Sequence, residues 1–232
     1  VLDDTTNWEN SGEEQVFDLL SALGNNAMNS LLKAINEDIL SAQSGKTILG
    51  YQDIMKDATG GTVGGINSGT STFWENQRYT SAKTFTTATI TNVFDGFIAW
   101  NTLMDDNRKQ GGRNNAIVTT YSIAAAYRTV LSSQGYGEVS LSNVKGVSGP
   151  EFPSYMGADV IADNDCAALH SYLLDTDSIK LRVMKQANFK KTPFVSLQGN
   201  GQLAQLAYMV AGVQLTTNNR RRSGVVTALT GI

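Results

Sequence analysis

The sequence contains very few of the residues from which catalytic and metal-binding sites are most often built. Among its 232 residues there is one histidine, His170, and one cysteine, Cys166. A single cysteine excludes an intrachain disulfide and fits a reducing compartment. These two side chains, with Asp163 and Asp165 nearby, cannot close a zinc site of the usual kind, which draws further ligands from cysteine and histidine. Neither a metal nor a cofactor is therefore predicted.

Charged residues are also scarce. They make up 17% of the chain, and the net charge is −3, whereas about a quarter of the residues of a soluble domain are usually charged. Because buried charge is costly unless it is paired, a weakly charged surface suits a protein whose faces are covered by neighbouring molecules. The negative net charge argues against a protein that binds nucleic acid by broad neutralisation of phosphates.

Long apolar runs are absent as well. None reaches the roughly 18 residues of a membrane span, so no membrane contact is expected. Residues 1–10 are acidic and polar, which predicts no signal peptide at this end. The chain begins at Val1 instead of Met, so we expect that an earlier segment was removed or lies outside this sequence.

The hydrophobic pattern predicts one long helix over residues 11–43. Ser11 and Glu14 form a capping box at its start, and Ser44-Gly45 supplies a stop. Between them, apolar residues recur at spacings of three and four, as one face of a helix requires. This apolar face consists of Val16, Leu20, Leu23, Ala27, Leu31, Ile35 and Ile39.

The rest of the chain predicts a mixed structure. Residues 45–80 are rich in loop-forming residues, and helices are expected at 89–110 and 121–133, with a short buried strand at 115–119 between them. From Tyr155 onward the pattern is mainly that of strands, which are expected at 156–163, 169–175, 178–184, 203–217 and 223–229. Helices that come first, followed by mixed elements and then strands, indicate an α+β fold.

Two glycine-containing segments resemble phosphate-binding loops only in part. Ser44-Gly45-Lys46-Thr47 has the G-K-T ending, but position 40 is Leu40 where the motif needs glycine, and a helix precedes it where the motif needs a strand. The glycine run at 60–65 lacks the G-x-G-x-x-G spacing. A polar turn after a helix and a tightly turning loop are the better interpretations.

His170 would have to serve any Ser/His/Asp or Cys/His device in this chain, because it is the only histidine. A histidine within an apolar strand is more often simply packed or hydrogen-bonded, and Cys166 is expected to be a small buried thiol. Several carboxylate pairs can each be explained as a helix cap, a turn or solvated surface, and they are Asp3-Asp4, Glu13-Glu14, Asp105-Asp106 and Asp175 with Asp177. No catalytic residue is predicted.

The densest run of charge is Arg220-Arg221-Arg222, which follows Asn218-Asn219. One interpretation is a contact to phosphate or to carboxylates of a neighbouring subunit, for which the guanidinium fork is well suited. The other is a solvated hairpin turn between two strands. Both stay open, and the three arginines are possible subunit-contact residues.

Several motifs, in order, resemble those of a family of tailed-phage major capsid proteins. The stretch from Gly61 to Asn67, followed by Phe73-Trp74-Glu75-Asn76, is similar to the family's "G-T-V-G-G-I-N … F-W-R-N" signature. The stretch 155–163 resembles its "Y-M-G-A-D-V" strand, and 172–177 its "Y-F-L-N-T-D-Y" strand. The long helix resembles its "E-A-V-x-D-L-L" helix, and the last β segment, after Gln205, also fits.

The resemblance implies the Hong Kong 97-type capsid fold. In the family, a peripheral domain is built on a spine helix, and an axial domain accompanies it. Residues 1–74 would form the peripheral domain with the spine helix at 11–43, residues 75–165 mainly the axial domain, and residues 166–232 the strands that complete both sheets. Members also carry an N-terminal arm and an extended loop before the spine helix, and this chain apparently lacks them. The family's arginine after the tryptophan is Glu75 here, and its "L-N-T-D" asparagine is Asp175.

The resemblance further implies a structural protein and not an enzyme. Copies would assemble into pentamers and hexamers of an icosahedral shell around double-stranded DNA, made in the bacterial host cytoplasm and found in the virion. Scaffold, portal or decoration proteins are possible further partners, and DNA would be enclosed without sequence-specific binding. The alternatives are an encapsulin or gene-transfer-agent shell protein and, from other classes, a small hydrolase using His170 and a monomeric binding module.

Overall fold

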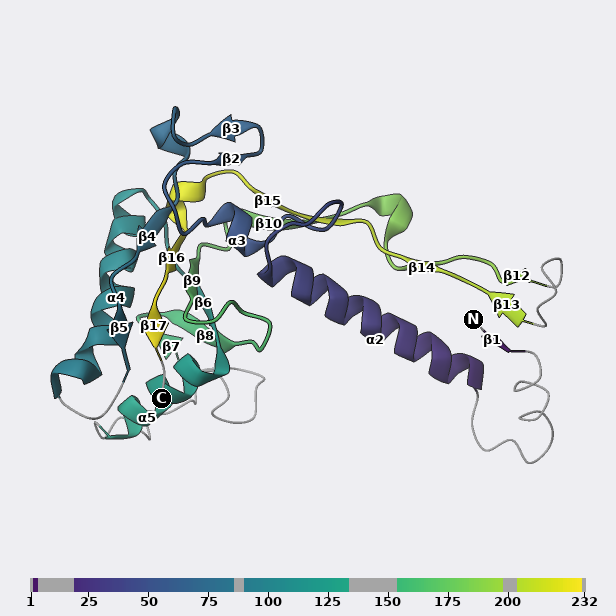
Figure 1. Cartoon of the computed structure of the whole chain (residues 1–232), viewed down its shortest axis with the longest axis horizontal. Coiled ribbons are helices and arrows are strands. Elements are labelled where there is room, and N and C mark those ends of the chain that lie inside the picture. Colours follow the sequence, from purple (N-terminus) through teal and green to yellow (C-terminus); the bar gives the residue numbers. More distant parts are fainter. Residues whose placement is uncertain (1, 4–18, 86–89, 134–153, 198–203, 231–232) are drawn as a thin grey trace. The chain divides into compact units, whose positions relative to one another are not determined.

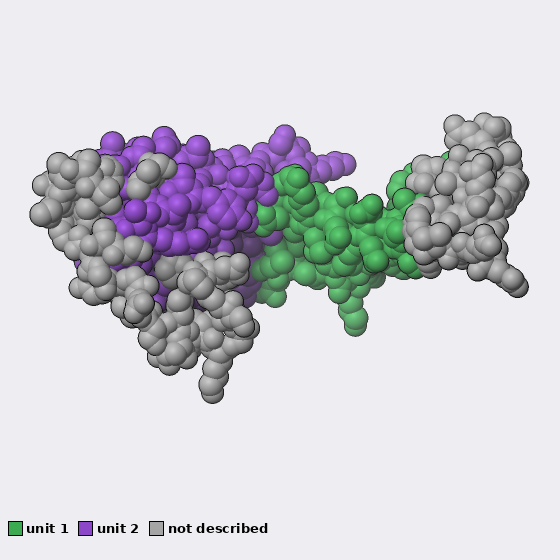
Figure 2. Space-filling view, turned by 90° about the horizontal axis from the view of Figure 1, so that it is seen from below, with its two compact units in different colours: residues 1–37, 181–214 green, residues 38–180, 215–232 purple. Residues whose placement is uncertain are grey.

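The computed structural model describes residues 2–3, 19–85, 90–133, 154–197 and 204–230. The chain divides into two compact units, coloured separately in Figure 2. Unit 1 consists of residues 1–37 and 181–214, and unit 2 consists of residues 38–180 and 215–232. The chain therefore leaves unit 2 after residue 180 and returns to it at residue 215.

Unit 2 is built on a six-stranded mixed sheet. Its strand order is β4-β16-β9-β6-β8-β7, where β16 pairs with β4 and β6 pairs with β8 in parallel and the other pairs are antiparallel. These strands are β4 (Gln77–Tyr79), β6 (Ala116–Thr119), β7 (Ser154–Tyr155), β8 (Ala158–Ala162), β9 (Ser171–Leu174) and β16 (Gly224–Val226). Every residue of β6, β9 and β16 is buried, as expected for strands whose two faces are both covered.

One face of this sheet packs against two helices, α4 (Ile90–Lys109) and α5 (Tyr121–Ser133). Figure 1 shows α4 running beside β4 and β5 (Lys83–Thr84). Ile117 lies opposite Leu173 in the register of β6 and β9, and both belong to the core together with Trp100 of α4 and Tyr127 of α5. The core is strongly aromatic, with edge-to-face or tilted ring contacts that join Phe85, Phe97, Trp100, Tyr127 and Tyr155. Burial raises the pKa of Tyr127 and of Tyr155 to about 12.

The other face of the sheet carries the alternate residues, because side chains alternate along a strand. Val118, Tyr172 and Val225 are aligned across β6, β9 and β16. The Tyr172 ring lies 5.9 Å from the ring of Tyr51, which begins the short helix α3 (Tyr51–Ile54). The remaining elements of unit 2 are the hairpin β2 (Thr62–Val63) with β3 (Ile66–Asn67), the 3-10 helices η1 (Thr72–Trp74) and η5 (Arg220–Arg222), and β17 (Leu229–Thr230), which pairs in parallel with β5.

Unit 1 holds most of the long helix α2 (Leu19–Leu40) and a set of short strands. β1 (Leu2–Asp3), β13 (Ala204–Leu206) and β12 (Val195–Ser196) form a three-stranded antiparallel sheet. β11 (Lys190–Lys191) pairs with β14 (Met209–Val210), and η3 (Lys185–Ala187) precedes β11. β10 (Ile179–Val183) pairs with β15 (Val213–Thr217), and both strands run from one unit into the other.

Most predicted elements are confirmed where the structure describes them, but the single strand expected at 223–229 is divided into β16 and the start of β17. α4, α5 and β6 fall within a residue of the expected ranges. The segment 203–217, expected as one strand, consists of β13, β14 and β15. The long helix ends at Leu40, three residues before the expected end, and residues 11–18, with the capping box, lie outside the described residues.

Two helical glycines allow a matched test of the packing of unit 2. A Cβ at Gly96 of α4 would meet the ring of the fully buried Phe85, whereas a Cβ at Gly24 of α2 would meet nothing within 4 Å. Alanine is favoured over glycine in a helix by about 1 kcal/mol, so Gly24→Ala should raise the free energy of unfolding by about that amount. Gly96→Ala should lower it by about 1–3 kcal/mol, because overpacking outweighs propensity. Denaturant unfolding of the unassembled full-length protein measures both, and a stabilising Gly96→Ala would contradict the close packing on Phe85.

Candidate functional site: the arginines of segment 220–222

The segment 220–222 contacts the end of α3, the end of η1 and the loop after α4. Asn219 caps η5, because its side-chain Oδ1 accepts a hydrogen bond of 3.0 Å from the backbone N–H of Arg221. The three arginines together form this 3-10 turn. Their surroundings differ: Arg220 is 1% exposed, whereas Arg221 and Arg222 are half-buried.

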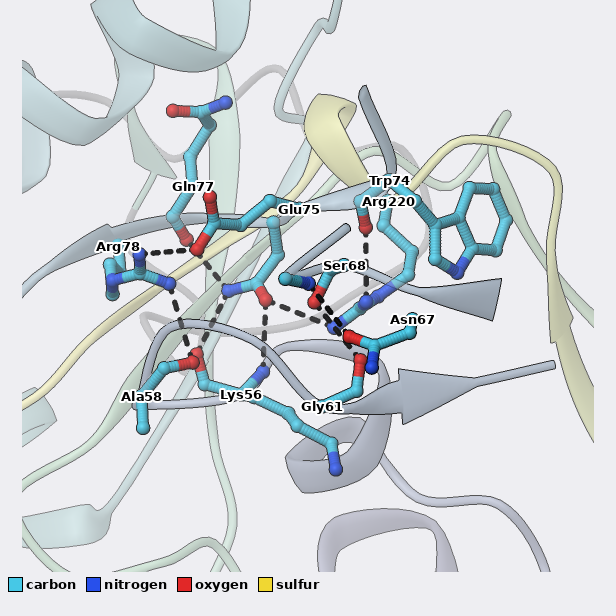
Figure 3. Close-up of polar contacts among 12 residues, drawn as sticks. Lys56, Ala58, Gly61, Asn67, Ser68, Trp74, Glu75, Gln77, Arg78 and Arg220 are labelled. Carbon is cyan, nitrogen blue, oxygen red and sulfur yellow. Dashed lines mark hydrogen bonds and ion pairs between the residues drawn. The ribbon is translucent and has the colours of Figure 1, made fainter. Parts of the chain in front are cut away.

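Arg220 is held by three oxygen atoms of its own chain, and Figure 3 shows its contact with the carbonyl of Trp74. Its Nε donates to the carbonyl of Ile54 at 2.6 Å, one terminal nitrogen donates to the carbonyl of Trp74 at 3.0 Å, and the other donates to Oδ1 of Asn76 at 3.0 Å. Burial lowers the pKa of this guanidinium, and the Glu75 carboxylate opposes the effect. A buried cation is costly unless it is hydrogen-bonded. Arg220 therefore joins its own segment to the end of α3 and to the stretch 74–76.

Asn76 extends this network to a further loop. Its Nδ2 donates to the carbonyls of Lys56 and Gln77, and its Oδ1 accepts from the backbone N–H of Lys56 as well as from Arg220. Glu75 does not bind Arg220 directly: its carboxylate pairs with Arg78 at 2.6 Å (Figure 3). The F-W-E-N stretch thus supplies a structural asparagine, Asn76. The motif alone does not predict this role.

The adjoining hairpin β2–β3 explains the glycine run. Gly64 and Gly65 both have positive φ angles, +61° and +81°, as the two central residues of a type I′ hairpin turn require. At the base of the hairpin, the backbone N–H and the hydroxyl of Ser68 both donate to the carbonyl of Gly61 at 3.0 Å. Trp74 Nε1 donates to the carbonyl of Val63. The run is the tightly turning loop that was the favoured interpretation.

Arg222 binds a fully buried carboxylate. Its Nε lies 2.8 Å from Oδ2 of Asp175, which is 0% exposed, and 3.0 Å from the carbonyl of Gly111. Asp175 also accepts hydrogen bonds from the backbone N–H groups of Arg113 and Asp177. The position where the resembled family has asparagine therefore carries the negative partner of Arg222. The sequence shows this aspartate in place of asparagine, but it does not predict that residues 175 and 222 form an ion pair.

These contacts bear on the two interpretations of the arginine run. Arg220 is not part of a solvated turn, and its guanidinium is used within its own chain. Arg221 makes its capping contact through the backbone N–H, and its buried Nε has no hydrogen-bond partner in the part of the chain that the structure describes. A contact of these arginines with a neighbouring subunit stays a prediction.

His170 has both ring nitrogens next to oxygen atoms. Nδ1 lies 2.6 Å from the carbonyl of Ala168, and Nε2 lies 2.9 Å from Oδ2 of Asp57. Burial, and then the Asp163 carboxylate, raises the pKa of the Cys166 thiol to about 12, so it is not an activated nucleophile. The described residues contain no cluster of three or more His, Cys, Asp or Glu side chains that could hold a metal ion.

The G-K-T segment forms a polar turn. Ser44 N–H donates to Oγ1 of Thr47 at 2.9 Å, Thr47 N–H donates to the carbonyl of Ser44, and Gly45 has a φ of +63°. These contacts occupy the amide groups of Ser44 and Thr47. Within the described part of the chain, no helix is long and apolar enough to cross a membrane.

The sequence matches no protein-family model and no curated protein sequence. Solved structures are nevertheless similar. The capsid of cyanophage A-1(L) superposes with a TM-score of 0.71 at 18% identity, covering 99% of this chain and 75% of that one. An encapsulin from Synechococcus elongatus gives 0.61 at 8% identity, with 94% and 68% covered. The capsid of a native GTA particle gives 0.54 at 16% identity, with 94% and 67% covered. The chain therefore has the fold of phage capsid proteins, and the expected α+β capsid fold is confirmed.

Proposed function

We propose that the chain is a major capsid protein, a structural subunit and not an enzyme. Copies form pentamers and hexamers of an icosahedral shell that encloses phage double-stranded DNA, after synthesis in the host cytoplasm. The fold supports this proposal, since its structural neighbours are shell proteins. The division into a peripheral domain (1–74), a mainly axial domain (75–165) and completing strands (166–232) belongs to the same proposal.

The observation that carries the proposal is that the described residues of unit 1 form almost no core. Among the described residues of that unit, Ala204 is the only hydrophobic side chain that is buried. Its strands and the residues beside them instead expose large apolar side chains, which are Leu181, Val183, Met184, Phe194, Val195, Tyr208 and Val210. Burial of apolar surface is what offsets the entropy lost on folding. Unit 1 thus needs other surfaces to cover it, and contacts with further copies supply them.

A single substitution in this exposed set tests the proposal. Tyr208 is 62% exposed, next to β14. Tyr208→Asp should leave the subunit folded but lower the yield of shells at least about tenfold, because assembly would bury an unpaired carboxylate. Tyr208→Phe, which keeps the ring, should assemble as the wild type does. Light scattering and electron microscopy of the full-length protein measure both, with circular dichroism as the control for folding.

Two outcomes would contradict the proposal. One is a full-length wild-type protein that stays a small monomer under every assembly condition tried. The other is a Tyr208→Asp variant that forms shells as readily as Tyr208→Phe does. Either result would show that the exposed apolar side chains of unit 1 are not covered by other copies.

The contents of the shell separate phage, gene-transfer-agent and encapsulin functions. Similarity to the Synechococcus encapsulin, with a TM-score of 0.61, keeps the last of these open. Nuclease-protected DNA of one defined sequence in purified particles supports the phage proposal. Protected fragments of random host sequence indicate a gene transfer agent, and shells without nucleic acid indicate an encapsulin. The hydrolase alternative has less support, because both ring nitrogens of His170 lie against oxygens of the chain itself.

A further inference from the structure

A cavity of about 360 Å³ opens at the C-terminal end of α4, within unit 2. Its size falls at the lower end of the range for small-molecule sites. Three stretches form it: the last turns of α4, the loop that follows, and the turn between β7 and β8. The lining residues are Met104, Arg108, Gly112, Arg113, Asn114, Met156 and Gly157.

The end of α4 brings two arginines to this cavity. The N–H of Gly112 donates to the carbonyl of Asn107, and the N–H of Gly111 donates to that of Arg108, as in a Schellman motif with Gly111 in the left-handed region. The chain reverses at this motif. Arg108 on the helix and Arg113 after the turn therefore line the same space.

Positive charge exceeds negative charge around the turn. Arg108 pairs with Asp105 at 3.3 Å, and Arg222, which donates to the carbonyl of Gly111, pairs with Asp175. The exposed guanidinium of Arg113 has no hydrogen bond or ion pair with any residue that the structure describes. None of the lining residues is acidic. One guanidinium is thus left without a counter-charge at the wall of the cavity.

Among the other lining residues, Asn114 is polar and buried, and Met156 and Gly157 form the β7–β8 turn. The amide oxygen of Asn114 accepts a hydrogen bond of 3.1 Å from the buried Asn107, which precedes it in sequence. The amide NH2 of Asn114 has no partner among the described residues. Met156 and Gly157 occupy the β7–β8 turn with φ angles of +50° and +86°. Met156 is 56% exposed and therefore lies at the solvent edge of the cavity.

We propose that this cavity binds an oxyanion, a carboxylate or phosphate group, between Arg108 and Arg113. The planar guanidinium presents its N–H groups as a fork that matches two oxygens of such a group. The ligand neutralises the unpaired charge of Arg113. This binding is separate from the shell contacts of unit 1, because every lining residue belongs to unit 2.

Titration of the full-length protein with inorganic phosphate and, separately, with succinate at constant ionic strength tests the site. We expect saturable binding of at least one probe by calorimetry, and the tighter probe identifies the preferred group. Arg113→Gln should weaken binding about tenfold, the usual effect of losing a charge-assisted hydrogen bond. Arg182→Gln, at an exposed arginine outside the cavity, should leave binding unchanged.

A second pair of variants does not depend on Arg113. Aspartate and asparagine tolerate a positive φ better than most residues, so both suit position 156. Met156→Asp places a carboxylate at the edge of the cavity and should weaken binding of the probe about tenfold, whereas Met156→Asn should not. The proposal is overturned if neither probe binds saturably, if Arg113→Gln binds as the wild type does, or if Met156→Asn loses binding as much as Met156→Asp.

Discussion

Replacing Arg220 by methionine should lower the free energy of unfolding of the subunit by about 3 kcal/mol or more. The guanidinium serves the carbonyls of Ile54 and Trp74 and the Oδ1 of Asn76, and it is 1% exposed. The two carbonyls lose this donor, at about 1–3 kcal/mol for each buried acceptor, whereas Oδ1 of Asn76 keeps the backbone N–H of Lys56. Relief of the cost of burying the cation offsets part of this sum. Denaturant unfolding of the unassembled full-length protein measures the change.

Two lysine variants separate geometry from charge. Arg220→Lys keeps the charge, but its compact ammonium cannot reproduce the planar fork that reaches three oxygens, so we expect most of the loss to persist. Arg221→Lys, at the next position, should change the stability by less than about 0.5 kcal/mol, because the hydrogen bond of Arg221 to Asn219 uses the backbone N–H. Equal stabilities of Arg220→Lys and the wild type would argue against a role for the fork.

Replacing Asp175 by asparagine should lower the free energy of unfolding by about 1–3 kcal/mol. Asp175 is fully buried, pairs with Arg222 at 2.8 Å and accepts backbone N–H groups of Arg113 and Asp177. The change leaves the charge of Arg222 without its partner, but this side chain is 28% exposed and stays partly hydrated, so the cost is below that of breaking a fully buried pair. Asparagine retains the size of the side chain, so the loss reports on charge more than on packing.

A double-mutant cycle shows whether the pair acts as a unit. Arg222→Met alone should also destabilise the protein, since it leaves the buried carboxylate without its cation. Asp175→Asn combined with Arg222→Met should cost less than the two single changes together, by about 1–3 kcal/mol. Strict additivity of the two changes would mean that the ion pair contributes no coupling energy.

Local patterns in the sequence were sufficient for most of the secondary structure. The end of α4 is an example, because Gly111-Gly112 follows a helical apolar pattern and forms the Schellman motif there. The strand at 203–217 was too long in the prediction because its breaks arise where the pairing partner changes from β12 to β11 and then to β10, which the local pattern does not show. β4 was missed for the same reason: Gln77–Tyr79 has little strand character alone and is held by parallel pairing with β16.

The contacts of the arginines at 220–222 could not be predicted from the sequence. The run at 220–222 was visible, as were the F-W-E-N stretch and Asp175, but their association depends on contacts across 144 to 166 residues for Arg220. A charge run on a polar segment is usually solvated, and only the tertiary structure shows that Arg220 is buried. The same limit applied to Arg108 and Arg113, whose shared cavity includes the β7–β8 turn.

The buried thiol of Cys166 has a practical consequence for labelling. It is 6% exposed, and burial raises its pKa to about 12, so at pH 7 the thiol is almost entirely in its unreactive protonated form. Because the chain has no other cysteine, one cysteine introduced on the surface would be the single reactive position of each subunit. A fluorophore or spin label could then be attached at one defined point on every copy without removing the native cysteine.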